Sequence, residues 1–483
     1  AGIHAGEIDG KDAGLMLLRD MTVKGTRRAL LDRANWLFMP ILNVDGHERS
    51  SAFSRINQRG PAESGWRTNA RNLNLNRDFT KLDAPETRAV VGVLRTWDPD
   101  LWADLHVTDG SDHQYDITFG HNVGSTWSPA IERWLEGALV PAVTRDLQAM
   151  GHVPGPLWVA NPVDVTDLAK GFTQWVAQPR FSTGYGDLRH VPTLLLENHS
   201  LKPYAQRVLG TYVFLESLLR ALADGKGLLR AAVAEDEARR APEVPIDFGP
   251  PAAPAAETHP YLAVEQRVEK SAVSGGPRVV YTGKPVTVTV PLLAFAPSVR
   301  ASRPAAYWVP STWPEVIERL AAHGIRMERV DAPREVEVEM SRATEASLAP
   351  APFEGRVPVT ATFAVETRKE RYPAGSVRVP TDQPLGELAV ILLDPASADS
   401  FFRWGFFLEV LQPTEYVEAY VMEPMAERML AADPALEAEF EAWAAAEPEL
   451  AAKPAERLQW LYRRTPYFDQ RYRLYPVGRE LSR

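Results

Sequence analysis

The stretch Thr193-Leu194-Leu195-Leu196-Glu197-Asn198-His199 is a short apolar run that ends in polar residues. Similar apolar runs occupy residues 34–42 and 101–106. Around them lie segments whose apolar residues recur every three to four positions, at 82–97, 128–150 and 204–222. Short apolar runs are typical of buried strands, and the longer spacing is typical of helices that cover a sheet. The first part of the chain, to about residue 220, therefore predicts an α/β domain.

A proline-rich segment follows this domain. Six prolines lie among Ala and Gly between residues 242 and 260, a composition that interrupts helices and strand ladders. We interpret residues 240–260 as a linker. Beyond it, we expect strands at 279–293 and 357–379, a short helix at 312–323 ended by Gly324, and mostly helical structure at 400–461. The expected organisation is a domain over 1–225, the linker, and a smaller α+β region over 261–483.

The composition is that of a globular protein and excludes several function classes. Of 483 residues, 45% are hydrophobic and 24% are charged. The net charge is 53 − 63 = −10 and no basic cluster is present, so no nucleic-acid partner is expected. Cys is absent, so a metal would need His and carboxylate ligands. No run reaches the roughly 18 apolar residues of a membrane helix, so no membrane insertion is expected.

The segment His4-Ala5-Gly6-Glu7 places an imidazole and a carboxylate three positions apart, with a glycine that lets the backbone bend between them. Such a pair can bind one cation, although a surface His beside a surface Glu is the competing interpretation. Leu101-Trp102-Ala103-Asp104-Leu105-His106 ends an apolar strand in a second His. Catalytic zinc often takes two His and one carboxylate, which His4, Glu7 and His106 would supply. A hydrogen-bonded His that closes a strand remains the alternative for His106.

Asn residues alternate with Leu at 72–76, which predicts a strand with Asn72, Asn74 and Asn76 on one face. Arg77 follows directly, and a guanidinium suits a carboxylate ligand. A satisfied polar ladder with Arg77 paired to Asp78 is the alternative interpretation.

Glu197 ends the apolar run that opens this section. Partial burial favours proton uptake by a carboxylate, as a general base requires. A salt bridge from Glu197 to Lys202 or Arg207 is the competing interpretation.

In this order, the four features resemble the zinc carboxypeptidases of the carboxypeptidase A-like family, peptidase family M14. The resemblance spans about residues 3–204 and implies a mixed central sheet flanked by helices. It implies one zinc ion per chain, held by His4, Glu7 and His106, with Glu197 as general base and acid toward the attacking water. It also implies that Asn76 and Arg77 bind the terminal carboxylate of a peptide and that Arg67 stabilises the oxyanion. Arg55 and Arg59 are fallbacks for Arg67.

The sequence departs from the family pattern at two positions. Where the family commonly has an Asp that accepts a hydrogen bond from the first zinc His, this chain has Asn74. A neutral amide can orient that His but raises its basicity less. The family's mobile capping Tyr corresponds best to Tyr185, with Tyr204 as the competitor, and either could instead be a packed aromatic.

Further expectations concern both ends of the chain. The family normally carries a strand and a helix before the His-x-x-Glu turn, and these elements are expected to be missing here. The C-terminal half resembles the extension of a bacterial subset of these peptidases, in Arg371-Tyr372-Pro373-Ala374-Gly375 and in residues 399–407 and 464–467. The aromatic run at 401–407 is expected to be packed core, and His323 to be a cationic helix end. The compartment stays open, with an extracytoplasmic location favoured if a signal has been removed.

The resemblance implies a zinc metallocarboxypeptidase that hydrolyses the C-terminal bond of peptides with a free carboxylate. The substrate pocket floor is expected in loops at about 154–181. A zinc amidase or deacylase on N-acyl amino acids or cell-wall peptides is the second hypothesis. A non-catalytic peptide- or sugar-binding module is the third.

Overall fold

A four-stranded mixed sheet forms the centre of the N-terminal half. The computed structural model describes residues 1–251 and 257–481, and the strands of this sheet follow the order β1-β5-β2-β3. β1 is parallel to β5, whereas β2 is antiparallel to β5 and parallel to β3. The strands are β1 (Trp102–Val107), β2 (Ile117–Gly120), β3 (Pro154–Gly155) and β5 (Thr193–Asn198). The predicted α/β class with a mixed sheet is confirmed.

Helices cover both faces of this sheet. The helices of this half are α1 (Asp9–Thr22), α2 (Val44–Glu48), α3 (Pro85–Trp97), α4 (Pro129–Trp134), α5 (Val140–Ala149), α6 (Ser182–Leu188) and α7 (Tyr204–Ala238). Leu17 of α1 and Phe214 of α7 lie in one core cluster with Leu105 and Leu196 of the sheet. α3 and α6 contribute Val90 and Leu188 to a second cluster. The covering helices expected from the sequence are confirmed, and the last is longer than expected.

The expected boundaries of the domain and the linker are wrong. Residue 225 lies inside α7, which continues to Ala238. The expected linker contains β6 (Glu243–Gly249), which pairs with β9 (Ala296–Ser302). The apolar residues that alternate along β6 are buried, and this burial outweighs the ladder hydrogen bond that Pro245 cannot donate. Residues 252–256 of the expected linker lie outside the described residues.

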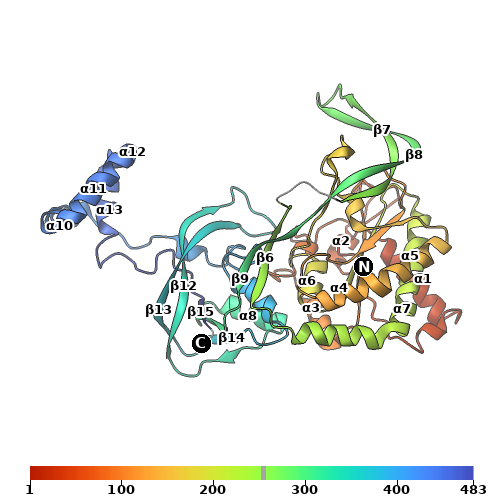
Figure 1. The fold of residues 1–483 in the computed structure, drawn as a ribbon, viewed down its shortest axis with the longest axis horizontal. Helices are drawn as coiled ribbons and strands as arrows, with labels where there is room; N and C mark the ends of the chain where they lie inside the picture. The colour runs from red at the N-terminus through yellow and green to blue at the C-terminus, as the bar shows by residue number, and fades with distance from the viewer. Residues whose placement is uncertain (252–256, 482–483) are drawn as a thin grey trace.

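A long hairpin projects from the N-terminal half (Figure 1, green). It consists of β7 (Thr258–Lys270) and β8 (Pro277–Ala294), and β8 also pairs in parallel with β4 (Phe172–Gln174). The strand expected at 279–293 is thus confirmed within β8.

The C-terminal region contains a six-stranded sheet in the order β11-β14-β10-β15-β12-β13. Its strands are β10 (Ala306–Val309), β11 (Glu328–Arg329), β12 (Arg334–Leu348), β13 (Val359–Tyr372), β14 (Val377–Pro380) and β15 (Gly478–Glu480). The helices beside it are α8 (Pro314–His323) and α9 (Gly386–Leu393). α8 ends as predicted, because Gly324 takes the left-handed conformation at φ +84°.

The two halves share one hydrophobic core. A single cluster joins Leu73 and Val90 of the N-terminal half to Leu320, Leu392 and Phe401 of the C-terminal region. The aromatic side chains of 401–407 are buried in it, which confirms the expected packed core. The C-terminal region is therefore packed against the N-terminal half as part of the same body.

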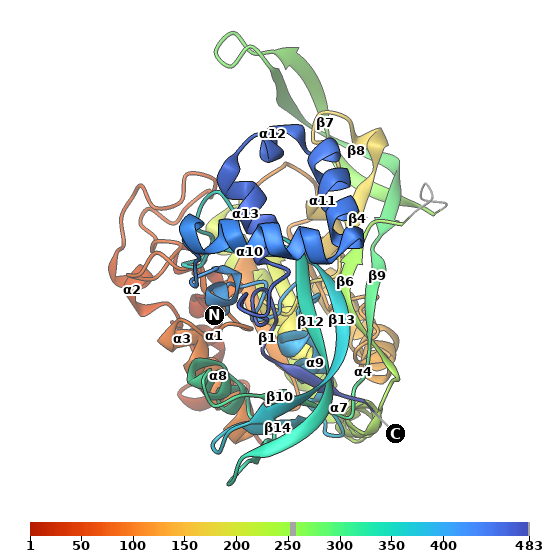
Figure 2. The same cartoon turned by 90° about the vertical axis from the view of Figure 1, so that its left-hand side faces the viewer.

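Four helices form an arm that stands apart from the rest of the molecule (Figure 1, blue), and Figure 2 views the molecule from the side of this arm. They are α10 (Ala419–Ala432), α11 (Pro434–Ala446), α12 (Pro448–Ala451) and α13 (Pro454–Tyr462), and they bury a separate cluster around Met422 and Phe440. The helical structure expected at 400–461 is confirmed from residue 419. Between 400 and 418, turns and the 3₁₀ helix η6 (Leu408–Leu411) replace it.

The apolar run at 34–42 does not form the strand that its composition suggested. Leu42 N donates to Ala1 O, and the amino group of Ala1 donates to Met39 O, but these bonds are too few for a ladder. Within the part of the chain that the structure describes, no helix has the length and apolar character needed to span a bilayer.

Candidate metal centre

His4 and Glu7 meet in a tight turn directly before α1. The backbone N–H of Glu7 donates to His4 O over 3.0 Å, and His4 Nδ1 lies 2.9 Å from Glu7 Oε1. Gly6 is required here for space, because a Cβ on it would lie 2.5 Å from Arg55 Cγ and 2.7 Å from Gly65 O. The turn therefore presents both side chains to the same point.

His106 reaches that point from β1. Its Nδ1 lies 2.8 Å from Glu7 Oε2, and the backbone N–H of Val107 donates to the same oxygen over 3.1 Å. One ligand atom each of His4, Glu7 and His106 lies within 4.8 Å of the others, and all three residues are buried. The structure thus brings together the three residues that the sequence singled out as a ligand set.

Each imidazole has a hydrogen-bond partner behind it. His4 Nε2 donates to Asn74 Oδ1 over 2.9 Å, as expected for Asn74. His106 Nε2 lies 2.8 Å from Asp104 Oδ2, which also accepts from Ser182 Oγ over 2.5 Å. Sequence reasoning missed Asp104 and Ser182. The signal for Asp104 was available, since residues two apart on a strand share a face.

Burial and the neighbouring charges have opposing effects on the pKa values of these three residues. Burial raises the pKa of Glu7, but the attraction of His4 and His106 overcomes it and holds that pKa well below its usual value. Burial also lowers the pKa of His4. For His106 burial acts in the same direction, but Asp104 and Glu7 raise its pKa well above the ordinary value.

Glu197 lies beside the three residues because β1 and β5 pair in parallel with His106 opposite Glu197. Side chains opposite each other on neighbouring strands point to the same face. Burial raises the pKa of Glu197 to about 8, and among the described residues its Oε2 has no hydrogen-bond partner. Lys202 donates to His113 O and Arg207 pairs with Asp9, so the alternative salt bridge to Glu197 is wrong.

The Asn-rich segment is not a strand. Asn72 takes a left-handed conformation at φ +59°, and residues 75–77 form the 3₁₀ helix η2 (Leu75–Arg77). Asn74 caps η2, because its Oδ1 accepts from the N–H of Asn76 over 3.0 Å. This local bond competes with ladder pairing and explains why the alternation misled the sequence interpretation.

Although this segment is not the expected strand, Asn76 and Arg77 both contact the start of α6, at Ser182 and Phe181. Asn76 Oδ1 accepts from Ser182 N over 2.8 Å, so its NH₂ group is the part that could bind a ligand. The guanidinium of Arg77 lies over the ring of Phe181 at 4.1 Å. Burial, and then the positive charge of Arg67, lower the pKa of Arg77 to about 10. Among the described residues Arg77 has no ion-pair partner, and the alternative pairing with Asp78 is wrong, because Asp78 pairs with Lys81.

The other candidate arginines differ in their distance from Glu7. Arg55 Nη1 donates to Glu7 Oε1 over 2.8 Å, whereas Arg67 Nη1 lies 3.5 Å from that oxygen and is more exposed. Arg59 is exposed, and its backbone N–H donates to Ser200 O. Arg55 and Arg67 are therefore the arginines beside the group.

Neither candidate for a mobile capping tyrosine fits that role. Tyr185 is fully buried, and its hydroxyl lies 2.8 Å from His323 Nδ1. Tyr204 donates a short hydrogen bond to Asp12. His323 ends α8 as expected, but it does not carry the expected positive charge, because burial lowers its pKa to about 3. These three residues stabilise the packing of α6, α7 and α8 against the body.

A cavity of about 1040 Å³ opens beside Glu197. Its lining includes Thr108 and Asp109, just past His106, and residues between Pro156 and Ala177. The loops at 154–181 that were expected to carry the pocket floor thus contribute to this lining.

The residues present suit a zinc ion. Two imidazole nitrogens and a carboxylate are the donor set of many catalytic zinc sites. Donation through Nε2 leaves the lone pair of His4 on Nδ1, and that atom faces Glu7 and His106. The unpartnered oxygen of Glu197 beside them is the acceptor that a water would need.

Parts of this chain are similar in sequence to known carboxypeptidases. The family model described as zinc carboxypeptidase matches residues 1–115. Carboxypeptidase 2 of Trichophyton tonsurans is 23% identical over 430 residues, which cover 84% of this chain and 72% of that relative. Carboxypeptidase 2 of Trichophyton equinum is 34% identical over 104 residues, 22% of this chain and 19% of that relative.

This chain is also similar to part of a solved structure. The metallo-carboxypeptidase from Burkholderia cenocepacia has a TM-score of 0.33 and 17% identity, covering 46% of this chain and 56% of that chain. The likeness of the C-terminal half to a bacterial subset stays a prediction.

Proposed function

Because this chain belongs to the zinc carboxypeptidase family and is a metallopeptidase, we propose that it removes the C-terminal residue of peptides with a free terminal carboxylate. His4, Glu7 and His106 would hold one zinc ion. A zinc ion in such a site supplies Lewis acidity, which polarises a carbonyl and makes water more acidic.

Glu197 would act as general base and then as general acid. Its raised pKa, about 8, suits a group that takes a proton from water and returns it to the leaving amine. In the overall reaction one water is consumed, the C–N bond breaks, and a new carboxylate and a free amine form.

Arg77 and Asn76 would bind the terminal carboxylate of the peptide. Support comes from the guanidinium of Arg77, which lacks an acidic partner among the described residues and lies close to the positive charge of Arg67. A carboxylate ligand would relieve this repulsion and form charge-assisted hydrogen bonds. Arg67, beside Glu7, would stabilise the oxyanion that develops on the scissile carbonyl.

The observation that carries the proposal is the pairing of β1 with β5, which sets His106 opposite Glu197. It brings a strand-end His from the metal-binding group next to a carboxylate with an unpartnered oxygen, at the edge of a cavity. A binding module would gain nothing from a carboxylate with a buried, unpartnered oxygen at this place.

Metal content and peptide hydrolysis of the wild type and of Glu197→Gln test the proposal. We expect one zinc per chain in both proteins, cleavage of peptides with a free C-terminus but not of amidated ones, and a loss of at least about 100-fold in kcat for Glu197→Gln. Zinc binding with cleavage of N-acyl amino acids alone would favour the deacylase. Zinc binding with no turnover would favour the binding module, and a protein without zinc would contradict the proposal.

A further inference from the structure

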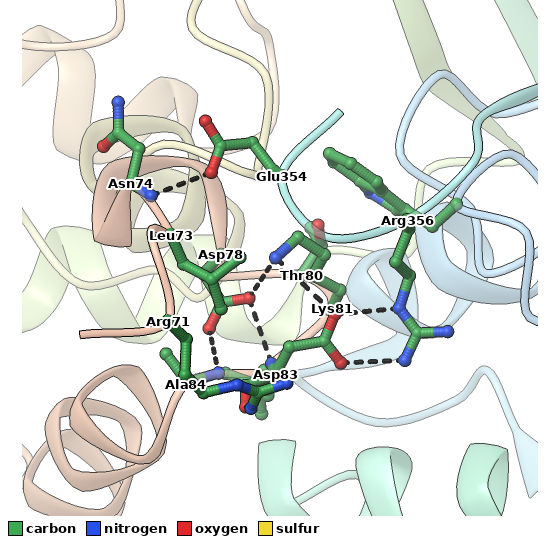
Figure 3. A network of polar contacts seen from close by, with 12 residues as sticks. Arg71, Leu73, Asn74, Asp78, Thr80, Lys81, Asp83, Ala84, Glu354 and Arg356 are labelled. Atoms are coloured by element: carbon green, nitrogen blue, oxygen red, sulfur yellow. Dashed lines mark hydrogen bonds and ion pairs between the residues drawn. The ribbon is translucent and has the colours of Figure 1, made fainter. Parts of the chain in front are cut away.

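A loop of the C-terminal region touches the N-terminal half directly behind the metal-binding group. It connects β12 to β13 and spans residues 349–358 (Figure 3). At its tip Glu354 and Gly355 both have positive φ, at +49° and +79°. The Oε2 atom of Glu354 accepts a hydrogen bond from the backbone N–H of Asn74 over 2.8 Å.

We propose that Glu354 is a positioning residue for the metal ligand His4 and acts through Asn74. This inference rests on the proposed zinc site. Three consecutive contacts carry it: Glu354 holds the backbone of Asn74, Asn74 Oδ1 accepts from His4 Nε2 over 2.9 Å, and His4 Nδ1 faces Glu7. The hydrogen bond from Nε2 fixes the tautomer with a free lone pair on Nδ1.

Asn74 needs such support because of where it lies. Asn72, two residues earlier, has a left-handed conformation, and η2 starts one residue later, so no strand ladder holds the segment. The side chain of Asn74 already caps η2 and binds His4. Glu354 binds the backbone N–H of this residue and thereby fixes the segment from outside.

The loop itself is firmly anchored. Arg356 forms two hydrogen bonds of 2.8 Å with Asp83 (Figure 3). It forms another of 2.8 Å with Glu315. Asp83 lies in a turn stabilised by the buried ion pair of Lys81 with Asp78, over 2.5 Å. A two-point guanidinium–carboxylate contact restricts both partners more than a single bond does. Glu354 therefore reaches Asn74 from a rigid support.

The charge of Glu354 also compensates a feature of the site. Where the resemblance implies a carboxylate behind the first zinc His, this chain has the neutral Asn74. Glu354 places a negative charge one hydrogen bond away from that residue, and its attraction partly offsets the lowering of the pKa of Arg77. The C-terminal region thus contributes directly to the surroundings of the metal-binding group.

Zinc affinity of the full chain, measured by competition with a chromogenic chelator, tests the inference without requiring turnover. Glu354→Ala should weaken zinc binding about tenfold, the lower end of the 10- to 100-fold typical for partners of metal ligands. Glu354→Gln should recover most of this loss, because an amide oxygen can still accept the N–H of Asn74. Glu345→Gln, at an exposed acidic residue of β12 in the same hairpin, is the control and should bind zinc as the wild type does. Thermal unfolding of the metal-free proteins checks that every variant is folded.

A double-mutant cycle with Asn74→Ala gives the decisive comparison. If Glu354 acts through the Asn74 side chain, Glu354→Ala should have no further effect on zinc affinity in the Asn74→Ala protein. Additive losses would overturn the inference, as would wild-type affinity in Glu354→Ala. A wild type that binds no zinc would instead overturn the proposed function on which the inference rests.

Discussion

At the scale of single residues, the carboxylate of Asp104, which accepts a hydrogen bond from His106, should contribute to zinc affinity. Asp104 accepts from both His106 and Ser182 and lies buried in β1. We expect Asp104→Asn to weaken zinc binding about tenfold, because a neutral amide raises the basicity of the imidazole less. Zinc titration against a chelator measures this effect. Asp100→Asn, just before the same strand, is the control, since Asp100 pairs with Arg230 on the surface.

The residues of the metal-binding group and the general base could be predicted from the sequence, because their residue types and spacing indicate their chemistry. His4, Glu7, His106 and Glu197 were singled out by residue type and spacing, and the structure brings them together. The role of Tyr185 could not be predicted in this way, because an aromatic residue in a glycine-rich stretch can face solvent or core equally well. Its partner His323 is 138 residues away, and no local pattern reveals such a contact.

At the scale of elements, the strength of a prediction followed the number of local signals that agreed. α3 and α8 have Pro in the first turn, regular apolar spacing and a left-handed residue at the end, and both were predicted within a few residues. The Asn-rich segment had alternation alone. Asn side chains that bind the nearby backbone turned it into a capped 3₁₀ helix instead.

Helix α6 carries a pH-dependent contribution to stability. Burial raises the pKa of Asp187 to about 7, and its Oδ2 accepts from Asn122 and Ser125. Because this pKa is higher in the folded than in the unfolded chain, the folded chain holds an extra proton between about pH 4 and 7. The free energy of unfolding should therefore fall as the pH rises through that window, by at most about 4 kcal/mol from this group.

Asp187→Asn tests this contribution, because an amide oxygen can keep both contacts without a charge. Relative to the wild type, the variant should gain stability as the pH is raised from 4 to 8. Denaturant unfolding of the metal-free proteins at several pH values measures the difference. A constant difference across that range would show that Asp187 does not titrate as expected.

At the scale of the whole molecule, the shared core makes the N-terminal half dependent on the C-terminal region. Leu73 and Val90 pack in one cluster with residues such as Leu320 and Phe401. A fragment of residues 1–240 would expose this apolar surface, so we expect it to aggregate or remain partly unfolded. Size-exclusion chromatography and zinc binding of the fragment check this, and a soluble, zinc-binding fragment would contradict it.

The N-terminal half should not depend on the helical arm. Its hydrophobic cluster is separate, and the chain leaves and re-enters the body at adjacent points, since Arg473 N donates to Val410 O over 2.8 Å. Replacing residues 413–470 by a short Gly/Ser linker should leave zinc content and peptide hydrolysis within about twofold of the full chain. A large loss would assign the arm a direct part in the site.

The cavity suggests which peptides should be preferred. Its lining includes Asp109, Glu136, Glu197 and Glu257, and no Lys or Arg among the described residues. A C-terminal Lys or Arg should therefore be released with a kcat/KM at least about tenfold higher than that of Asp or Glu. This difference in kcat/KM should become smaller at high salt, because the side chains of Asp109, Glu136 and Glu257 are well exposed and their charges are screened. Removing Glu136 and Glu257 together as Gln should reduce the preference, and an unchanged preference would contradict this reasoning.

The contact of Glu354 with Asn74 spans 280 positions of the chain. During synthesis the N-terminal half leaves the ribosome first, so the ligand set and Glu197 are present well before the loop that supports them. The body's shared core likewise waits for residues such as Phe401. Full zinc affinity should therefore arise only after residues 349–358 and core residues such as Phe401 have been synthesised and have packed against the N-terminal half.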